Sequence, residues 1–115
     1  MKEFIKVMKA ASDPTRVKIL KMLEKKTMCV CEIQTGLGTA QSTASKHLKT
    51  LEDAGLISSR KDGLWVNYTL ADGSQSPYAA NLLGSIRHWL NDEPEIAVVT
   101  GKVPTLNRYE ILQKR

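Results

Sequence analysis

The sequence predicts a mainly helical α+β fold, a winged helix-turn-helix in which four helices are followed by two strands and a fifth helix. A short glycine-containing segment, residues 36–39, separates two expected helices at the spacing that a helix-turn-helix needs. The dipeptide Asp62-Gly63, favoured in tight hairpin turns, lies between two strand-like runs. Residues 1–70 carry 12 Lys and Arg against 7 Asp and Glu, whereas residues 71–115 carry 5 against 5. The part of the chain with these motifs holds the whole positive excess, as expected if it faces a polyanion.

Length and composition are those of one globular domain, with 115 residues, 42% hydrophobic and 25% charged. The first ten residues mix lysines with Glu3 and form no apolar signal, and no run of about eighteen apolar residues exists. We therefore expect a cytoplasmic protein with no membrane segment. In that reducing compartment, close cysteines are more often metal-binding or redox-active than joined in a structural disulfide.

The first two helices are indicated by apolar spacing and by a start signal. Apolar residues at helical spacing mark the first helix. They are Phe4, Ile5, Met8 and Ala11. Asp13 followed by Pro14 is a cap followed by proline at the first helical position, so a second helix is expected from there to about Lys25. Its inward residues are Val17, Ile19, Leu20 and Leu23.

The third and fourth helices flank the turn at residues 36–39. The third is expected to start near Met28 or Cys29 and to stop at the glycines Gly36 and Gly38. The fourth spans roughly residues 40–54, and Gly55 closes it. Its expected buried stripe is Ala44, Leu48 and Leu51.

After the hairpin, a fifth helix is expected from about Tyr78 to Leu90. Residues 1–92 then form one domain for DNA binding and dimerisation. Residues 93–115 give no clear pattern, because Pro94, Gly101 and Pro104 interrupt them, and only a helical turn within residues 106–112 is suggested.

The face of the fourth helix opposite its apolar stripe is rich in hydrogen-bonding groups and has no carboxylate before Glu52. We expect one part of it to approach base edges or nearby phosphates, namely Gln41, Ser42, Thr43 and Ser45. We expect basic side chains to neutralise phosphates, namely Lys46 and Lys49 with Arg60 and Lys61 of the hairpin. His47 either touches phosphate or is only a surface residue. The alternative for the whole face is a merely solvated polar surface.

The chain has only two cysteines, Cys29 and Cys31, and they lie about ten residues before the expected DNA-reading helix. Thiolates prefer soft ions such as Cu(I) and Zn(II) and, by extension, trivalent arsenic or antimony. The pair is therefore a candidate metal site and a chemical input to a DNA-binding output. The alternative is inert packing, because buried cysteine often acts as a small hydrophobe.

This arrangement resembles the ArsR/SmtB family of metal-responsive repressors over about residues 1–92. The residues that carry the resemblance are Asp13-Pro14-Thr15-Arg16 with Ile19 and Leu20, then Ser42, Ser45, Lys46, His47, Leu48 and Leu51 with Ala54-Gly55-Leu56-Ile57, and Arg60, Asp62, Gly63, Trp65, Val66, Tyr68 and Leu70 in the hairpin. Cys29-Val30-Cys31-Glu32-Ile33 is similar to the cysteine motif of the arsenic-responsive branch.

The resemblance implies a repressor with no constitutive cofactor that leaves its operator DNA when As(III) or Sb(III), as inducer, binds Cys29 and Cys31. That motif often has a third cysteine three residues after the second, where this chain has Gln34. The zinc-sensing branch places ligands along the fifth helix, where this chain has only His88.

Helical geometry suggests how metal binding by the two cysteines would affect DNA binding. In an ideal helix residues i and i+2 point about 200° apart, so two helical thiolates cannot both hold one ion. We therefore expect ligation to unwind the first turn of the third helix and to misplace residues 41–49. The helix N-terminus is also expected to lower the thiol pKa.

Apolar stripes on the first and fifth helices are hard to bury in so small a monomer, so we expect them to pair in a symmetric homodimer. The partner DNA is then a double-stranded, partly palindromic operator whose half-sites are about one helical turn apart.

Three alternatives remain open at this stage. The same fold could sense redox state or another soft metal such as Cd(II) or Pb(II). A thiol enzyme is disfavoured because the chain has no Cys-x-x-Cys spacing and no strand-helix alternation around the cysteines, so no enzymatic activity is expected. A winged helix that serves protein contacts only would lack salt-dependent DNA affinity.

Overall fold

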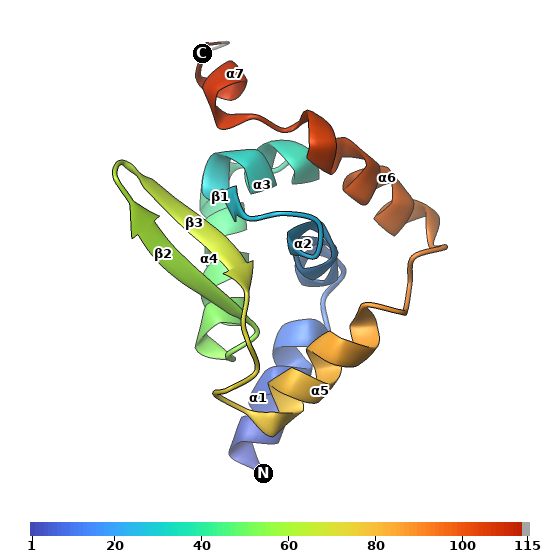
Figure 1. The fold of residues 1–115 in the computed structure, drawn as a ribbon. Coiled ribbons are helices and arrows are strands. Elements are labelled where there is room, and N and C mark those ends of the chain that lie inside the picture. Colours follow the sequence, from blue (N-terminus) through green and yellow to red (C-terminus); the bar gives the residue numbers. More distant parts are fainter. Residues whose placement is uncertain (114–115) are drawn as a thin grey trace.

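The computed structural model describes residues 1–113 (Figure 1). Its elements follow the predicted order and extend it with a short extra strand and a helical C-terminal segment. They are α1 (Lys2–Ala11), α2 (Pro14–Leu23), β1 (Met28–Cys29), α3 (Val30–Leu37), α4 (Gln41–Asp53), β2 (Ile57–Asp62), β3 (Trp65–Leu70), α5 (Pro77–Ile86), α6 (Pro94–Lys102), the 3-10 helix η1 (Val103–Thr105) and α7 (Arg108–Gln113). The winged helix-turn-helix fold class is confirmed.

The helix-turn-helix is formed by α3 and α4. Gly38 adopts a left-handed conformation with φ of 73° and ends α3, as a C-terminal glycine does when no Cβ opposes it. Gly36 does not end the helix as predicted. It lies inside α3, where an added Cβ would meet the terminal methyl of Met22 at 2.6 Å and Leu106 at 3.0 Å. This glycine is needed for close packing and not for a turn.

A three-stranded antiparallel sheet of order β1-β3-β2 forms the wing and ties it to the helical core. The hairpin β2–β3 projects to one side of the molecule, with its tip away from the helices (Figure 1). β1 pairs Met28 with Tyr68 and Cys29 with Asn67. The sequence did not predict this short strand.

The expected start of the third helix was therefore wrong. Met28 and Cys29 belong to β1, and α3 begins at Val30. The backbone groups of Met28 and Cys29 pair with β3, so these residues are extended and cannot also be helical.

The expected end of the fifth helix was also wrong. α5 ends at Ile86, and the amides of His88 and Trp89 bond three residues back, to Ser85 and Ile86. Leu90 then adopts a positive φ of 66°, which an α-helix does not allow. Trp89 and Leu90 are consequently exposed side chains beyond the helix.

The C-terminal segment folds onto the domain. Pro94 occupies the first turn of α6, and α6 packs against α2. The segment buries Val99, Val103 and Leu106 in the common core, and its Ile96 is buried as well. The prolines that obscured the pattern in the sequence begin helices here, because proline needs no hydrogen-bond partner for its nitrogen in a first turn.

The core gathers apolar side chains from all the major elements, including Ile19, Leu20, Ile33 and Leu48. Lys21 is completely buried among them; its Nζ donates to the Ile86 carbonyl at 2.8 Å and pairs with Glu24 at 2.9 Å. A buried ammonium needs such partners, and these connect α2 to the end of α5. Within the described residues, every helix is too short or too polar to cross a membrane.

The first helix buries Val7 and Ala10, whereas Met8 and Ala11 pack at the margin of the core. Phe4 and Ile5 of the predicted stripe remain 41% and 43% exposed. Helix α5 lies beside α1 (Figure 1).

Candidate functional site

The polar face of α4 lies on the surface. Ala44, Leu48 and Leu51 are fully buried, which fixes the orientation of the helix. The predicted contact residues Gln41, Ser42, Thr43, Ser45, Lys46 and Lys49 are exposed. These groups supply donors, acceptors and cations on the exposed side of α4. The first turns of α4 hold no acidic side chain to repel a phosphate.

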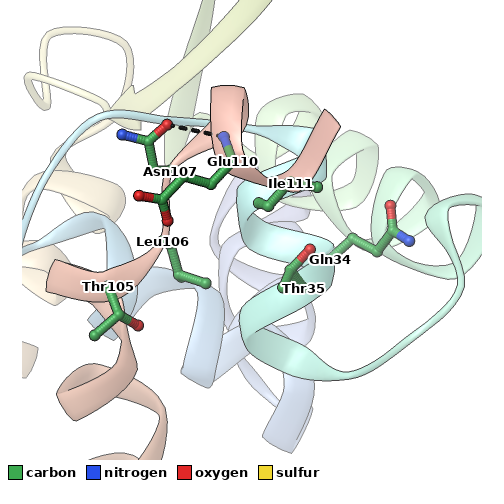
Figure 2. Close-up of a pocket in the computed structure, with 7 residues that line it drawn as sticks. All are labelled: Gln34, Thr35, Thr105, Leu106, Asn107, Glu110 and Ile111. Carbon is green, nitrogen blue, oxygen red and sulfur yellow. Dashed lines mark hydrogen bonds between the residues drawn. The ribbon is translucent and has the colours of Figure 1, made fainter. Parts of the chain in front are cut away.

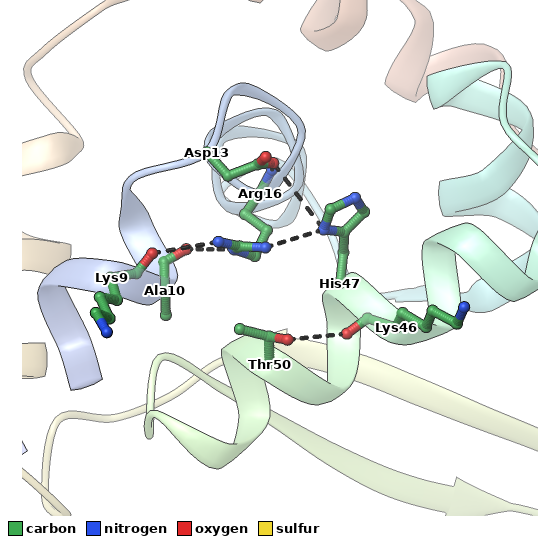
Figure 3. Close-up of polar contacts among 7 residues, drawn as sticks. All are labelled: Lys9, Ala10, Asp13, Arg16, Lys46, His47 and Thr50. Atoms are coloured by element: carbon green, nitrogen blue, oxygen red, sulfur yellow. Dashed lines mark hydrogen bonds and ion pairs between the residues drawn. The ribbon is translucent and has the colours of Figure 1, made fainter.

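His47 is half-buried and contacts α2 (Figure 3). Its Nδ1 lies 3.2 Å from Nη1 of Arg16 and 4.0 Å from the Asp13 carboxylate. Because a guanidinium can only donate, Nδ1 is the acceptor in this contact with Arg16. Arg16 also donates to the carbonyls of Ala10 at 2.7 Å and Lys9 at 3.2 Å. His47 and Arg16 thereby hold α4 against the junction of α1 and α2.

Arg16 is a positioning residue that the sequence analysis did not assign to the site. It stood within the Asp13-Pro14-Thr15-Arg16 signature, but its side-chain partners come from two other segments, α1 and α4, and are not visible in the sequence.

The wing presents Arg60 and Lys61 as exposed side chains of β2. In the sheet register they stand opposite Asn67 and Val66. The Ser59 hydroxyl donates to the Glu52 carboxylate at the end of α4, and α4 also packs against β2. The basic residues of the wing and the polar face of α4 therefore belong to one connected unit.

The cysteine pair is brought together more closely than the sequence analysis expected. The sulfur atoms of Cys29 and Cys31 lie 2.9 Å apart, and both side chains are buried. The predicted divergence of about 200° was wrong because Cys29 is not helical. It is the N-cap residue of α3, with extended backbone angles φ −87° and ψ 171°, and this turns its side chain back toward Cys31.

Glu32 completes this helix start. Its carboxylate accepts the Cys29 amide at 2.9 Å, while the Cys29 sulfur faces the Glu32 amide in a capping box. Cys29 therefore occupies the position that Ser or Thr usually takes in such a box. Any ligand on this sulfur competes with the bond that begins α3.

The thiol pKa does not follow the prediction either. Burial raises the pKa of the Cys29 thiol from 9.0 to about 12, assisted by its hydrogen bond with Cys31 and by the Glu32 charge. The backbone hydrogen bond from Glu32 lowers it, but by less than burial raises it. In the absence of a ligand, a neutral Cys29 thiol is therefore favoured.

Within residues 1–113 no group of three or more His, Cys, Asp or Glu side chains is arranged to hold a metal ion. Gln34 is at the third position of the motif, and its Oε1 is buried without a hydrogen-bond partner. The described residues therefore bring together two sulfur atoms as candidate ligands, and a three-coordinate ion would need its third ligand from elsewhere.

Comparison with known proteins gives the family. The sequence model described as bacterial regulatory protein, arsR family, matches residues 13–59. An HTH-type transcriptional regulator of Methanocaldococcus jannaschii is 46% identical over 67 residues, which cover 57% of this chain and 75% of that protein. The chain belongs to the arsR family.

Other arsR-family relatives add detail. The arsenical resistance operon repressor of Escherichia coli is 40% identical over 68 residues, and the match covers 58% of each chain, so this protein spans little more than half of that relative. A solved structure of a homodimeric winged helix-turn-helix DNA-binding domain from Mycobacterium bovis shares the fold, with a TM-score of 0.64 and 24% identity over 93% of this chain and 86% of that one.

The raised pKa of Cys29 makes a prediction about stability. The unfolded thiol loses its proton near pH 9, whereas the folded thiol keeps it up to about pH 12, so its stabilising contribution is lost as pH rises between these values. Between about pH 8 and about pH 10 the parent should lose about 1.4 kcal/mol more unfolding free energy than Cys29→Ser. Urea denaturation at both pH values measures this difference, and the surface variant Ser42→Ala should follow the parent. Equal losses in the parent and in Cys29→Ser would show that the thiol is not held neutral.

Proposed function

We propose that this arsR-family protein is a homodimeric transcriptional repressor that leaves its operator when As(III) or Sb(III) binds Cys29 and Cys31. The observation that supports it best is the 2.9 Å separation of the two sulfurs at the N-terminus of α3. This short helix leads through the Gly38 turn directly into the exposed polar face of α4.

DNA binding is supported by the shape and charge of one surface. The polar face of α4 is suited to the major groove, which admits one helix and presents base-specific donors and acceptors. Lys46, Lys49, Arg60 and Lys61 add four cations on α4 and β2, whose polyanionic partner is the phosphate backbone. We propose that His47 contributes mainly by holding α4, since its Nδ1 is engaged by Arg16.

Dimerisation is supported by the apolar side chains that α1 and α5 leave uncovered. Phe4 and Tyr78 stack edge to face with ring centroids 5.4 Å apart, and they remain 41% and 38% exposed, next to the exposed Ile5. An exposed aromatic and aliphatic group of this kind on a small domain is a natural contact for a second copy. The M. bovis domain of the same fold is homodimeric.

The inducer chemistry is consistent with a neutral Cys29 thiol. When arsenous acid binds two thiols, two As–S bonds form and two As–O bonds break. Each hydroxide that leaves the arsenic takes up one thiol proton and becomes water. No net proton is released. A divalent cation such as Cd(II) must instead displace both protons, which the raised pKa of Cys29 makes costly at neutral pH. The site therefore favours As(III) over divalent soft metals.

Ligation need not unwind α3. Metal–thiolate bonds of about 2.3 Å place two sulfurs on one ion roughly 3–4 Å apart, so the pair has to open by only about 1 Å. The Cys29 sulfur then leaves the capping box with Glu32, and the start of α3 loses a stabilising contact of about 1 kcal/mol. A hundredfold loss of operator affinity requires a coupling free energy of about 2.8 kcal/mol between ligand binding and DNA binding. Two strong metal–sulfur bonds can supply that much.

The dimer is tested by placing a charge in its expected interface. Ile5→Glu buries an unpaired carboxylate there and should weaken association at least about a hundredfold, because such burial costs roughly 3 kcal/mol or more. Sedimentation velocity over a range of protein concentrations measures the change. Val98→Glu, at a 61% exposed apolar position on α6, is the matched control and should stay dimeric. A dimeric Ile5→Glu variant would place the interface elsewhere.

The DNA surface is tested by the salt dependence of binding. Lys46→Ala and Arg60→Ala should each reduce the slope of log Kd against log salt by about 1.8, since each removes one phosphate contact from each subunit of the homodimer. Gln41→Ala should instead relax base preference at one operator position without changing this slope. Fluorescence anisotropy with a duplex selected by the parent protein from a random library provides both readouts. The exposed Lys102→Ala should leave the slope unchanged. If all three lysine and arginine variants behave alike, the surface is not the one that meets DNA.

The inducer is tested on the same duplex. Arsenite should release the parent, while Cys29→Ser and Cys31→Ser should bind DNA as tightly as the parent and require at least about a hundredfold more arsenite. The arsenite response should be nearly independent of pH between about 6 and 8, whereas Cd(II) affinity should rise steeply over that range. Release of both serine variants at the parent's arsenite concentration contradicts the proposal, and so does release by peroxide but not by arsenite.

A further inference from the structure

A row of three residues runs across the sheet from the cysteine pair to the wing. Cys29 on β1 pairs with Asn67 on β3, and Asn67 pairs with Arg60 on β2. Because neighbouring strands are about 4.8 Å apart, Cys29 and Arg60 lie only about 10 Å from each other along this row. The thiol site thus has a second mechanical connection to the expected DNA surface, in addition to the one through α3 and α4.

The C-terminal helix α7 contacts Asn67, the middle residue of this row. Nη1 of Arg108 donates to Oδ1 of Asn67 at 3.0 Å. The same guanidinium lies over the ring of Trp65, 4.9 Å from its centroid, and Tyr109 meets that ring edge to face at 6.2 Å. A planar guanidinium suits this double role, because it can stack on an aromatic face while its edge donates hydrogen bonds. The contact connects residues 41 positions apart in the sequence.

The other contacts of α7 are with α3 and with Trp65 of the wing. Within the described residues α7 has no fully buried side chain, and it packs against α3 beside a pocket of about 560 Å³, which Glu110 and Ile111 line together with Gln34 and Thr35 of α3 (Figure 2). The other hydrogen bonds of α7 go to Asn107, the residue just before it. Among residues 1–113, the bond from Arg108 to Asn67 is therefore the only hydrogen bond between α7 and a distant part of the domain. The segment just before α7 is anchored separately, where Lys26 donates to the Leu106 carbonyl at 2.6 Å.

The sheet has only two residues in β1, so its edge is weakly held by its own hydrogen bonds. A contact that fixes the Asn67 side chain from outside keeps β3 in register with β1 and limits local slippage. None of Trp65, Asn67 and Arg108 lies within residues 13–59, the part that the arsR-family description matches.

We propose that the row Cys29–Asn67–Arg60, clamped by Arg108, transmits the response of the cysteine pair to the wing, with Arg108 as a positioning residue. This inference rests on the proposed function and names how that function is regulated. When the Cys29 sulfur moves to bind its ligand, β1 shifts against β3, and the clamped row passes the shift to Arg60. Without the clamp, β3 yields locally and the wing keeps its position.

The experiment compares operator affinity with and without saturating arsenite, using the full chain and the selected duplex. The ratio of the two Kd values should be about 100 or more for the parent. It should fall at least tenfold for Arg108→Gln and for Asn67→Ala, while Kd without arsenite stays within about threefold. The double variant should show no further loss, because both changes break one contact. Arg108→Lys, which keeps a donor and a cation beside Trp65, should recover part of the ratio.

Arg87→Gln is the matched control, since Arg87 is an exposed arginine at the end of α5. It should behave like the parent. If Arg108 instead contacts DNA directly, Arg108→Gln weakens binding without arsenite and reduces the salt slope, while Asn67→Ala does neither; that result overturns the proposal. A parent that ignores arsenite refutes the proposed function itself, whereas a responsive parent with an unchanged ratio in both variants refutes only the clamp.

A spectroscopic readout separates transmission from simple stability. In a Trp89→Phe background, Trp65 is the remaining tryptophan, and it reports on the wing. Arsenite should change its emission, and Asn67→Ala should reduce that change. An unaltered Trp65 emission at arsenite concentrations that release DNA would show that the signal does not pass through this row.

Discussion

The extended backbone of Cys29 is the constraint on which the arrangement of the site depends. Its pairing with Asn67 forms the edge of the sheet, and its φ and ψ also make it the N-cap of α3. One residue thus joins the wing to the helix-turn-helix. The same conformation turns its sulfur toward Cys31, so a close thiol pair lies where the wing meets the helix-turn-helix, the two elements that we propose contact DNA.

Burial gives this site its chemical character. A Cys29 thiolate in a buried position beside the Glu32 carboxylate is poorly solvated, which raises the pKa of Cys29 and favours its neutral thiol. The helix N-terminus and the backbone amide of Glu32 act in the opposite direction but do not outweigh desolvation. In the proposed function, a neutral Cys29 thiol favours ligands that remove its proton as water.

Much of the fold could be predicted from local patterns. The Asp13-Pro14 start of α2, the buried stripe of α4 and the Asp62-Gly63 turn follow from capping, periodicity and turn chemistry, which act over a few residues. The two cysteines and the exposed groups of α4 could likewise be selected from the sequence alone. The start of α3, the end of α5 and the helical C-terminal segment could not, because long-range pairing and burial decide them.

The sequence by itself determined the order of the elements from α1 to α5 apart from β1, the composition of the α4 surface and the presence of a thiol pair, since each depends on neighbouring residues. Only the tertiary structure decided how that pair is used. β3 holds Cys29 extended, the core desolvates its sulfur, and contacts from distant segments place Arg16 beside His47 and Arg108 beside Asn67. These features depend on partners far away in the chain, and a local pattern contains no information about which partners will meet.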